Sequence, residues 1–192
     1  MARVKSFNKE EILRKATELF WKKGFHGTSI QELVEYTGLS RSSLYDTYGD
    51  KYNLFIETLK SYQEKTRKSL ATLPQQNNIK NFIQQFLDSR VAISLKDQDH
   101  KGCFLANCSV EMAPHDQKVC DITLESMDAF VERFTPVFEK GITDGEINTA
   151  KKPRALARYL FNTVTGLLVI GKTTQDPKIL NEIVETSMNA IF

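Results

Sequence analysis

Apolar residues recur every three or four positions along almost the whole chain, and no stretch alternates apolar and polar residues as a half-buried strand would. This periodicity predicts helices over about residues 8–24, 28–37, 41–47, 51–71, 79–95, 102–112, 114–140, 153–173 and 177–191. The chain is therefore expected to be all-α, with about nine helices. A proline in a polar run, residues 73–78, marks the clearest predicted linker.

The first two helices carry clear start and stop signals. Asn8 can cap the first helix with its side chain, and Gly24 supplies the backbone conformation that ends it. Thr28, with Gln31 three residues later, is interpreted as a capping box at the start of the second helix. Gly38 then permits the left-handed backbone of a sharp turn. Two helices joined in this way form the helix-turn-helix pattern of DNA-binding proteins.

The third helix is short and polar, and Ser40 is its predicted cap. Leu44 and Tyr48 form its apolar face. Its exposed face is expected to hold Arg41, Ser42, Ser43, Asp46 and Thr47. An arginine can contact guanine or phosphate in bidentate fashion, and short hydroxyl side chains permit close approach to the bases. The spacing alone also fits a capped surface helix in a plain bundle, and Asp46 would be unfavourable near phosphate.

The charge distribution is compatible with a phosphate-binding surface near the N-terminus. The net charge is +2. Residues 1–51 hold nine Lys and Arg against seven Asp and Glu, whereas the remainder is balanced at 17 of each. No apolar run approaches the roughly 20 residues of a membrane span, and the basic N-terminus leads into no apolar signal segment. We therefore expect a cytoplasmic protein with no membrane partner.

A longer set of residues around this pattern resembles the N-terminal head of the TetR/AcrR family of transcriptional regulators. The matching runs, within about residues 8–56, are Thr28-Ser29-Ile30-Gln31-Glu32-Leu33, Thr37-Gly38-Leu39-Ser40, Ser43-Leu44-Tyr45, Tyr48-Gly49-Asp50-Lys51 and Leu54-Phe55. The resemblance implies a helix-turn-helix DNA-binding domain over residues 1–50 and a ligand-binding and dimerisation domain over 51–192. It also implies a ligand-responsive regulator, most simply a repressor, whose homodimer binds a palindromic operator in double-stranded DNA through the helix at 40–47.

The resemblance assigns roles to individual positions of the head. Thr28 and Lys51 match the family's phosphate contacts, at helix N-termini whose dipoles attract anions. Tyr45 and Tyr48 match its aromatic positions, with Tyr45 on the DNA side. The expected DNA-binding residues are Thr28, Ser40, Arg41, Ser42, Ser43, Tyr45, Thr47, Tyr48 and Lys51. Asp46 stands where many members carry a histidine or an aromatic residue, so it either accepts from a cytosine amino group or faces away from DNA.

The last two helices are expected to form the dimer interface. Family members pair these helices with those of a twin subunit, and here they carry more apolar surface than a hairpin packed on one side needs. Ordinary core packing within one chain is the alternative. The expected interface residues are Leu156, Tyr159, Leu160, Thr163, Val164, Leu167, Ile179, Ile183, Val184 and Met188.

A ligand pocket is expected among the helices between the linker and the dimer face. Its expected lining residues are Phe82, Phe86, Cys103, Phe104, Asn107, Met112, His115, Met127, Phe130, Phe134 and Phe161. Because this set is large and aromatic, a small-molecule inducer is expected to be apolar or aromatic. For any one of these residues, simple core packing is the commoner role.

The three cysteines are expected to be free thiols. Lys101-Gly102-Cys103 resembles a TetR subgroup in which some members sense electrophiles through a cysteine, which would make the inducer thiol-reactive. A helix N-terminus and Lys101 would give Cys103 thiolate character, whereas a buried cysteine is usually inert, and both interpretations stay open. A Cys103–Cys108 disulfide is not expected, since roughly 8–9 Å of helix would separate their Cα atoms against a limit of ~7 Å.

An enzyme and a helical carrier protein are the rival classes. Three scattered histidines offer no HExxH-like metal spacing, and nothing marks Cys103 and His115 as a catalytic pair. A carrier would not bind duplex DNA at physiological salt. We therefore expect a regulator that is not an enzyme and that uses no metal or other cofactor.

Overall fold

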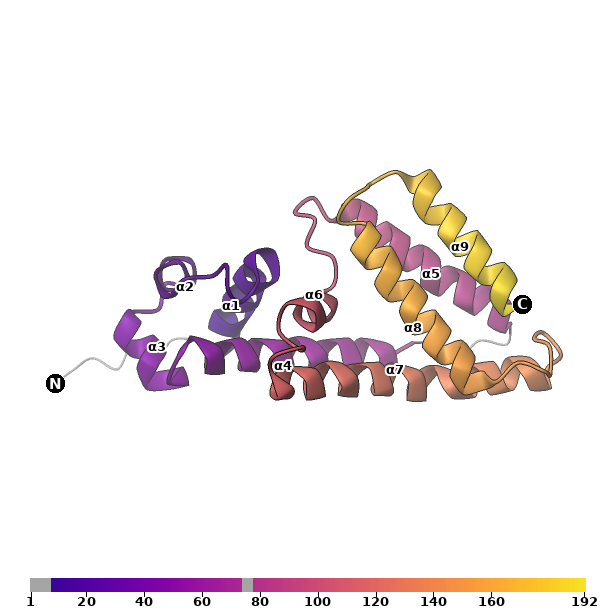
Figure 1. Cartoon of the computed structure of the whole chain (residues 1–192), viewed down its shortest axis with the longest axis horizontal. Coiled ribbons are helices and arrows are strands. Elements are labelled where there is room, and N and C mark those ends of the chain that lie inside the picture. The colour runs from indigo at the N-terminus through magenta and orange to yellow at the C-terminus, as the bar shows by residue number, and fades with distance from the viewer. Residues whose placement is uncertain (1–7, 74–77) are drawn as a thin grey trace.

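The computed structural model describes residues 8–73 and 78–192, which form nine α-helices and no strand. The helices are α1 (Lys9–Lys23), α2 (Ile30–Thr37), α3 (Arg41–Tyr48), α4 (Lys51–Ala71), α5 (Ile79–Lys96), α6 (Phe104–Glu111), α7 (Gln117–Thr143), α8 (Pro153–Ile170) and α9 (Pro177–Ile191). Figure 1 shows α1–α3 at one end of an elongated molecule and α5, α8 and α9 at the other, with α4 and α7 running side by side. The predicted all-α fold is confirmed.

The second helix begins at Ile30, two residues after the predicted Thr28, and its cap lies one residue after the predicted one. Ser29 caps α2 in place of Thr28: its hydroxyl oxygen accepts from the Glu32 backbone N–H, and the Glu32 carboxylate accepts from the Ser29 N–H at 2.8 Å. The capping box therefore lies one residue later than the expected pair of Thr28 and Gln31. The Thr28 hydroxyl instead donates to the Gly24 carbonyl oxygen at 2.7 Å.

The other bounds differ mainly where a cap or a break was misplaced. Helix α7 begins at Gln117, three residues after the expected Pro114. Asp116 caps it, and the Asp116 carboxylate accepts from the Val119 N–H at 3.0 Å. That helix continues through Gly141 to Thr143, three residues beyond the predicted end at 140. Helix α8 ends at Ile170, before the predicted 173. Of the predicted linker at 73–78, residues 74–77 lie outside the described residues.

One hydrophobic cluster joins the helix-turn-helix head to α6 and to the start of α7. Its buried members include Phe20, Leu33, Leu44, Leu54 and Phe55 from α1–α4, Phe104, Cys108 and Met112 from the α6 region, and Val119 and Ile122 from α7. The head thus shares its core with α6, and a movement of α6 disturbs packing in the head.

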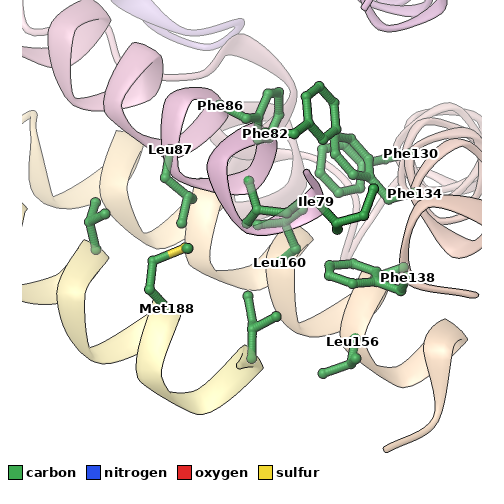
Figure 2. Packing of buried hydrophobic residues seen from close by; sticks show 14 of the residues in the cluster. Ile79, Phe82, Phe86, Leu87, Phe130, Phe134, Phe138, Leu156, Leu160 and Met188 are labelled. Carbon is green, nitrogen blue, oxygen red and sulfur yellow. The ribbon is translucent and has the colours of Figure 1, made fainter. Parts of the chain in front are cut away.

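A second hydrophobic cluster fills the space between α5, α7, α8 and α9 (Figure 2). Aromatic rings form its upper layer, where the centroids of Phe130 and Phe134 lie 4.4 Å apart and those of Phe86 and Phe134 lie 4.8 Å apart. Leu160 and Met188 extend the cluster between α8 and α9. The two clusters leave a cavity where α4 and α6 pass the body helices.

Within residues 8–73 and 78–192, no helix is both long and apolar enough to cross a membrane. The same residues contain no group of three His, Cys, Asp or Glu side chains placed to hold a metal ion.

Candidate DNA-binding surface and ligand pocket

The turn between α2 and α3 is sharp because Gly38 takes the left-handed conformation, with φ 74° and ψ 9°. Its N–H donates to the Val34 carbonyl oxygen at 3.0 Å, which closes α2. Leu39, in the turn between the two helices, is buried. Ser40 then caps α3, its hydroxyl oxygen accepting from the Ser43 N–H at 3.1 Å. These contacts fix the angle between α2 and α3.

Helix α3 presents a continuous polar face to solvent. The exposed side chains are Arg41, Ser42, Tyr45, Asp46 and Thr47, with Ser40 exposed just before them and Ser43 half-buried. Leu44 is fully buried on the opposite side. No ion pair occupies Arg41 within the described residues, so its guanidinium is free to contact a base edge or a phosphate.

Two of the expected DNA contacts, Thr28 and Tyr48, face the protein interior. Thr28 is 1% exposed and its hydroxyl proton is donated to Gly24, while Tyr48 is 7% exposed. The Tyr48 hydroxyl is buried without a hydrogen-bond partner among the described residues. In this conformation neither side chain can reach DNA, because α2 and α3 turn these positions toward the head core. We leave both out of the DNA contacts proposed below.

Lys51 braces the turn that precedes α2. Its Nζ donates to the carbonyl oxygens of Phe25 at 2.8 Å and Thr28 at 2.7 Å, and it lies 4.3 Å from the centroid of the Phe25 ring. Burial lowers the pKa of Lys51, and the nearby Glu111 carboxylate opposes that shift. The ammonium is thus committed to the backbone of the head, which is a different role from the expected phosphate contact.

Glu111, at the end of α6, holds the same turn from the other side. Its carboxylate accepts from the backbone N–H groups of Phe25 at 3.0 Å and His26 at 2.8 Å. Gly24 has φ +74°, and a Cβ there would lie 2.6 Å from the Glu111 carboxylate oxygen. The positive φ, and to a lesser degree the nearby carboxylate, favour glycine at this position.

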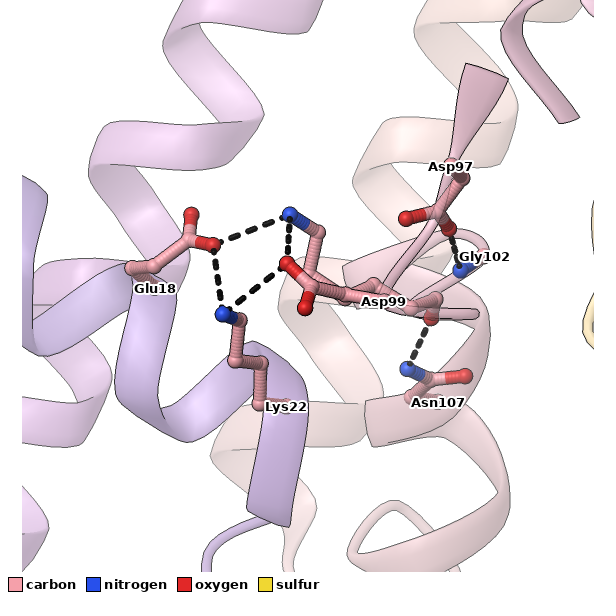
Figure 3. A network of polar contacts seen from close by, with 7 residues as sticks. Glu18, Lys22, Asp97, Asp99, Gly102 and Asn107 are labelled. Carbon is pink, nitrogen blue, oxygen red and sulfur yellow. Dashed lines mark hydrogen bonds and ion pairs between the residues drawn. The ribbon is translucent and has the colours of Figure 1, made fainter. Parts of the chain in front are cut away.

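A network of ion pairs ties α1 to the loop before α6 (Figure 3). Lys101 lies 2.9 Å from Glu18 and 3.4 Å from Asp99, and Lys22 lies 2.9 Å from Asp99. The Lys22 hydrogen bond lowers the pKa of Asp99. Asn107, expected in the pocket, instead donates to the Lys101 carbonyl oxygen at 2.9 Å and so orients this loop. Each exposed pair is weak alone, but together they fix the loop against α1.

A cavity of about 340 Å³ lies between α4, α5, α6, α7 and α8. Its lining residues are Tyr62, Lys65, Thr66, Ser69, Leu70, Leu73, Phe86, Arg90, Cys103, Leu105, Ala106, Ser109, Thr123, Ser126, Phe130, Phe161, Val164, Thr165 and Leu168. Of the expected pocket residues, Phe86, Cys103, Phe130 and Phe161 line it. Its size is near the lower end of the roughly 300–1,000 Å³ of small-molecule sites.

The other expected pocket residues lie elsewhere. Phe82 and Phe134 are buried in the body cluster and Met127 packs against it, Phe104 and Met112 belong to the head cluster, and His115 is exposed. These side chains point into the two hydrophobic clusters and away from the cavity, except that of His115, which is exposed to solvent.

Cys103 lines the cavity at the start of α6, but its environment does not favour the thiolate. Burial raises the pKa of its thiol, against the opposing effect of the Ala106 and Leu105 backbone N–H groups. Burial likewise raises the pKa of the Cys108 thiol. Of the two interpretations that the sequence left open for Cys103, the raised pKa favours the inert thiol, because desolvation outweighs the N–H groups.

Sequence reasoning missed most of the polar lining residues, among them Tyr62, Lys65 and Arg90. The first two lie on α4, from which no pocket residue was predicted. Arg90 follows Phe86 by four residues, so the two share one face of α5. A single arginine on an otherwise apolar helix face was the available signal.

Most of the expected dimer residues are core residues of a single chain. Leu156, Leu160, Leu167, Val184 and Met188 are buried in the body cluster, Thr163 is 7% exposed, and Val164 lines the cavity. Helices α5 and α7 already cover that side of α8 and α9, so these side chains pack within the single chain. Tyr159 and Ile179 are exposed and Ile183 is half-buried.

What remains is an open, shallow surface across α8 and α9, here called the α8–α9 face. It consists of Tyr159, Asn162, Thr163, Gly166, Ile170, Ile179, Glu182, Ile183, Thr186 and Ser187. A Cβ built on Gly166 meets no atom within 4 Å. The face mixes small, apolar and polar groups with one acid, Glu182, and its small residues permit close approach of a second pair of helices.

A helix-turn-helix head with a free polar third helix, packed on a helical body that holds a cavity, defines a ligand-responsive class of DNA-binding protein. A family model described as bacterial regulatory proteins of the tetR family matches residues 12–58, and one described as the tetracyclin repressor-like C-terminal domain matches residues 80–187. The chain belongs to the tetR family and is a DNA-binding transcriptional regulator.

Relatives and solved structures agree with this assignment. The HTH-type transcriptional regulator YezE of Bacillus subtilis (strain 168) is 32% identical, over 100% of both chains. The HTH-type transcriptional repressor ComR of Escherichia coli (strain K12) is 24% identical over 97% of this chain and 90% of its own. The TetR family regulator CifR, solved as a cysteine mutant with a 26-bp operator duplex, shares the fold with a TM-score of 0.84 and 24% identity over 100% of both chains.

Proposed function

We propose that this protein is a repressor whose dimer binds a palindromic operator through α3 and leaves it when a small molecule occupies the cavity. The observation that carries the proposal is the exposed polar face of α3, held at a fixed angle by Gly38 and Ser40. The proposed DNA contacts are Ser40, Arg41, Ser42, Ser43, Tyr45 and Thr47. The bacterial cytoplasm is the compartment in which such an operator is accessible.

The dimer is proposed to form through the α8–α9 face. Two-fold pairing of the body places two α3 helices on one side of the assembly, and a symmetric reader requires a symmetric operator. Half-sites read in successive major grooves are separated by about 34–36 Å, one turn of B-DNA.

The cavity and the DNA-binding head are proposed to communicate through α6. Leu105, Ala106 and Ser109 of α6 line the cavity, and Glu111 of the same helix holds the turn before α2. A ligand that binds better when α6 is shifted would loosen this turn and move α3 out of register with its partner. Because the pKa of Cys103 is raised, we favour a ligand that binds non-covalently over a thiol-reactive one.

Arg41→Ala is expected to relax operator specificity. Loss of a bidentate base contact costs about 1–3 kcal/mol of operator binding, whereas binding to random duplexes falls much less. Arg41 is exposed at the first turn of α3, and alanine is a good helix former, so the fold should persist.

The measurement is a pair of binding titrations, on selected operator and on random DNA of equal length. Arg154→Ala, an exposed arginine at the start of α8, is the matched control and should leave both affinities unchanged. Equal losses on both DNAs for Arg41→Ala would show that Arg41 does not read bases.

A further inference from the structure

The cavity contains a positive charge that no acid among the described residues neutralises. Arg90 of α5 lines it, and Lys65 of α4 lies at its exposed side. No Asp or Glu is among the lining residues, and Arg90 takes part in no ion pair within the described chain. A partly buried cation without a partner is costly, so its presence in a cavity indicates a role for the charge.

The guanidinium of Arg90 is held in place with most of its donors unused. Its Nε donates to the Ser89 hydroxyl at 3.1 Å, and its central carbon lies 4.8 Å from the centroid of the Phe86 ring. Burial lowers the pKa of Arg90, yet an arginine stays protonated at neutral pH. The described residues supply no partner for the two terminal nitrogens, which form the fork that matches a carboxylate.

Four of the seven hydroxyl groups that line the cavity offer little competition for an anion. Four lining hydroxyls, those of Thr66, Ser109, Thr123 and Ser126, already donate to carbonyl oxygens of their own helices. Their protons are therefore committed. A negatively charged group entering the cavity would find its strongest donors at Arg90 and Lys65.

The rest of the wall is apolar and suits an organic tail. Phe86, Phe130 and Phe161 form a continuous aromatic wall, with centroids 6.0 Å apart for Phe86 and Phe130 and 5.4 Å apart for Phe130 and Phe161. Leu70, Leu73, Val164 and Leu168 complete it. An inorganic anion would leave this surface unfilled, and a purely apolar molecule would leave the charge unpaired.

We propose that the cavity binds a small organic acid, with its carboxylate on Arg90 and its apolar or aromatic tail against Phe86, Phe130 and Phe161. This inference rests on the proposed function, because it names the chemistry of the ligand that the regulator senses. It changes the expectation from the sequence, which was an apolar or aromatic ligand with no charge requirement.

Three probes that differ only in their head group test the charge requirement: phenylbutyrate, phenylbutanol and phenylbutylamine. Calorimetric titration of the full-length protein should give a dissociation constant for the acid that is about 10- to 100-fold lower than for the alcohol. The amine should bind more weakly than the alcohol. Equal affinity for acid and alcohol, or no binding of any probe up to its solubility limit, overturns the proposal.

Variants at Arg90 test whether that residue supplies the preference. Arg90→Met should bring the acid and the alcohol to within about threefold of each other, while Arg90→Lys should keep a preference for the acid. Lys96→Met, an exposed lysine on the same helix, is the control and should leave the ratio unchanged. Thermal unfolding confirms that each variant is folded; should Arg90→Met fail to fold, the probe series on the wild-type protein still decides. An unchanged acid preference in folded Arg90→Met overturns the assignment.

Operator binding measured without any probe distinguishes a failure of the ligand assignment from a failure of the proposed function. A protein that binds a palindromic operator but shows no preference for the acid has lost only the ligand assignment. A protein that prefers the acid but binds no palindromic duplex is a carrier of organic acids, and then the proposed function fails while the cavity chemistry stands.

Discussion

A Gly166→Arg protein is expected to be a folded monomer with little affinity for the operator. Gly166 lies four residues before the end of α8, and a Cβ built there meets no atom of the protomer within 4 Å, so the fold has room for a side chain. Replacing a helical glycine also removes a propensity penalty of up to about 1 kcal/mol. Across the proposed interface, however, two arginines related by the two-fold axis would collide and repel.

Loss of the dimer removes the link between the two half-sites. Linked binding sites gain about 10²–10⁴-fold over either site alone, and operator affinity should fall by a factor in this range. Sedimentation measures the oligomeric state, and a titration with operator DNA measures the affinity.

Ala92→Arg on α5, exposed and outside the α8–α9 face, is the matched control and should remain dimeric. A Gly166→Arg protein that stays dimeric with full operator affinity would place the interface elsewhere.

Lys51→Met is expected to destabilise the head without changing the number of phosphate contacts. The substitution leaves the carbonyl oxygens of Phe25 and Thr28 without their donor, at a cost of about 1–3 kcal/mol. The unfolding temperature should then fall by roughly 3–10 °C. Operator affinity should fall too, because the turn before α2 is no longer fixed, but the slope of log affinity against log salt should stay the same.

The alternative that the family resemblance implies, a phosphate contact from Lys51, gives a different result. It predicts an unchanged unfolding temperature and a salt slope smaller by about one unit. Lys60→Met, an exposed lysine of the same helix, is the control and should alter neither quantity. Circular dichroism and salt-dependent titrations of the three proteins distinguish the two roles.

The helices of the head could be predicted closely because their signals are local. Asn8, Gly38, Ser40 and Asp50 each act through backbone groups within four residues, and a sequence displays such neighbours directly. The start of α2 shows the limit of this approach. Two hydroxyl residues are followed three positions later by Gln31 and Glu32, so two registers fit, and only the packing of Thr28 decides between them.

Side-chain direction was the part that the sequence could not supply. The apolar positions of α8 and α9 were recognised, but their number does not reveal how many other helices pack on them. Because α5 and α7 also contact these helices, Leu160 and Leu167 are core residues and Gly166 lies on the open face. The residues that line the cavity were hard to predict for the same reason, because five helices contribute to its wall.

The position of a residue within a family motif likewise did not predict which groups its side chain contacts. Lys51 stands where the family resemblance implies a phosphate contact, yet its ammonium donates to two carbonyl oxygens of the head. Glu111 is distant in sequence from the turn that it holds. These contacts link residues far apart in the chain, and they are also the ones through which α6 would transmit ligand binding to DNA.

Selection of bound sequences from a pool of random duplexes shows whether paired α3 helices read DNA. We expect enrichment of a two-fold symmetric sequence whose half-sites lie about one helical turn apart, with binding that weakens steeply as salt rises. Enrichment of an unsymmetric sequence, or no enrichment from a folded dimeric protein, would contradict this expectation.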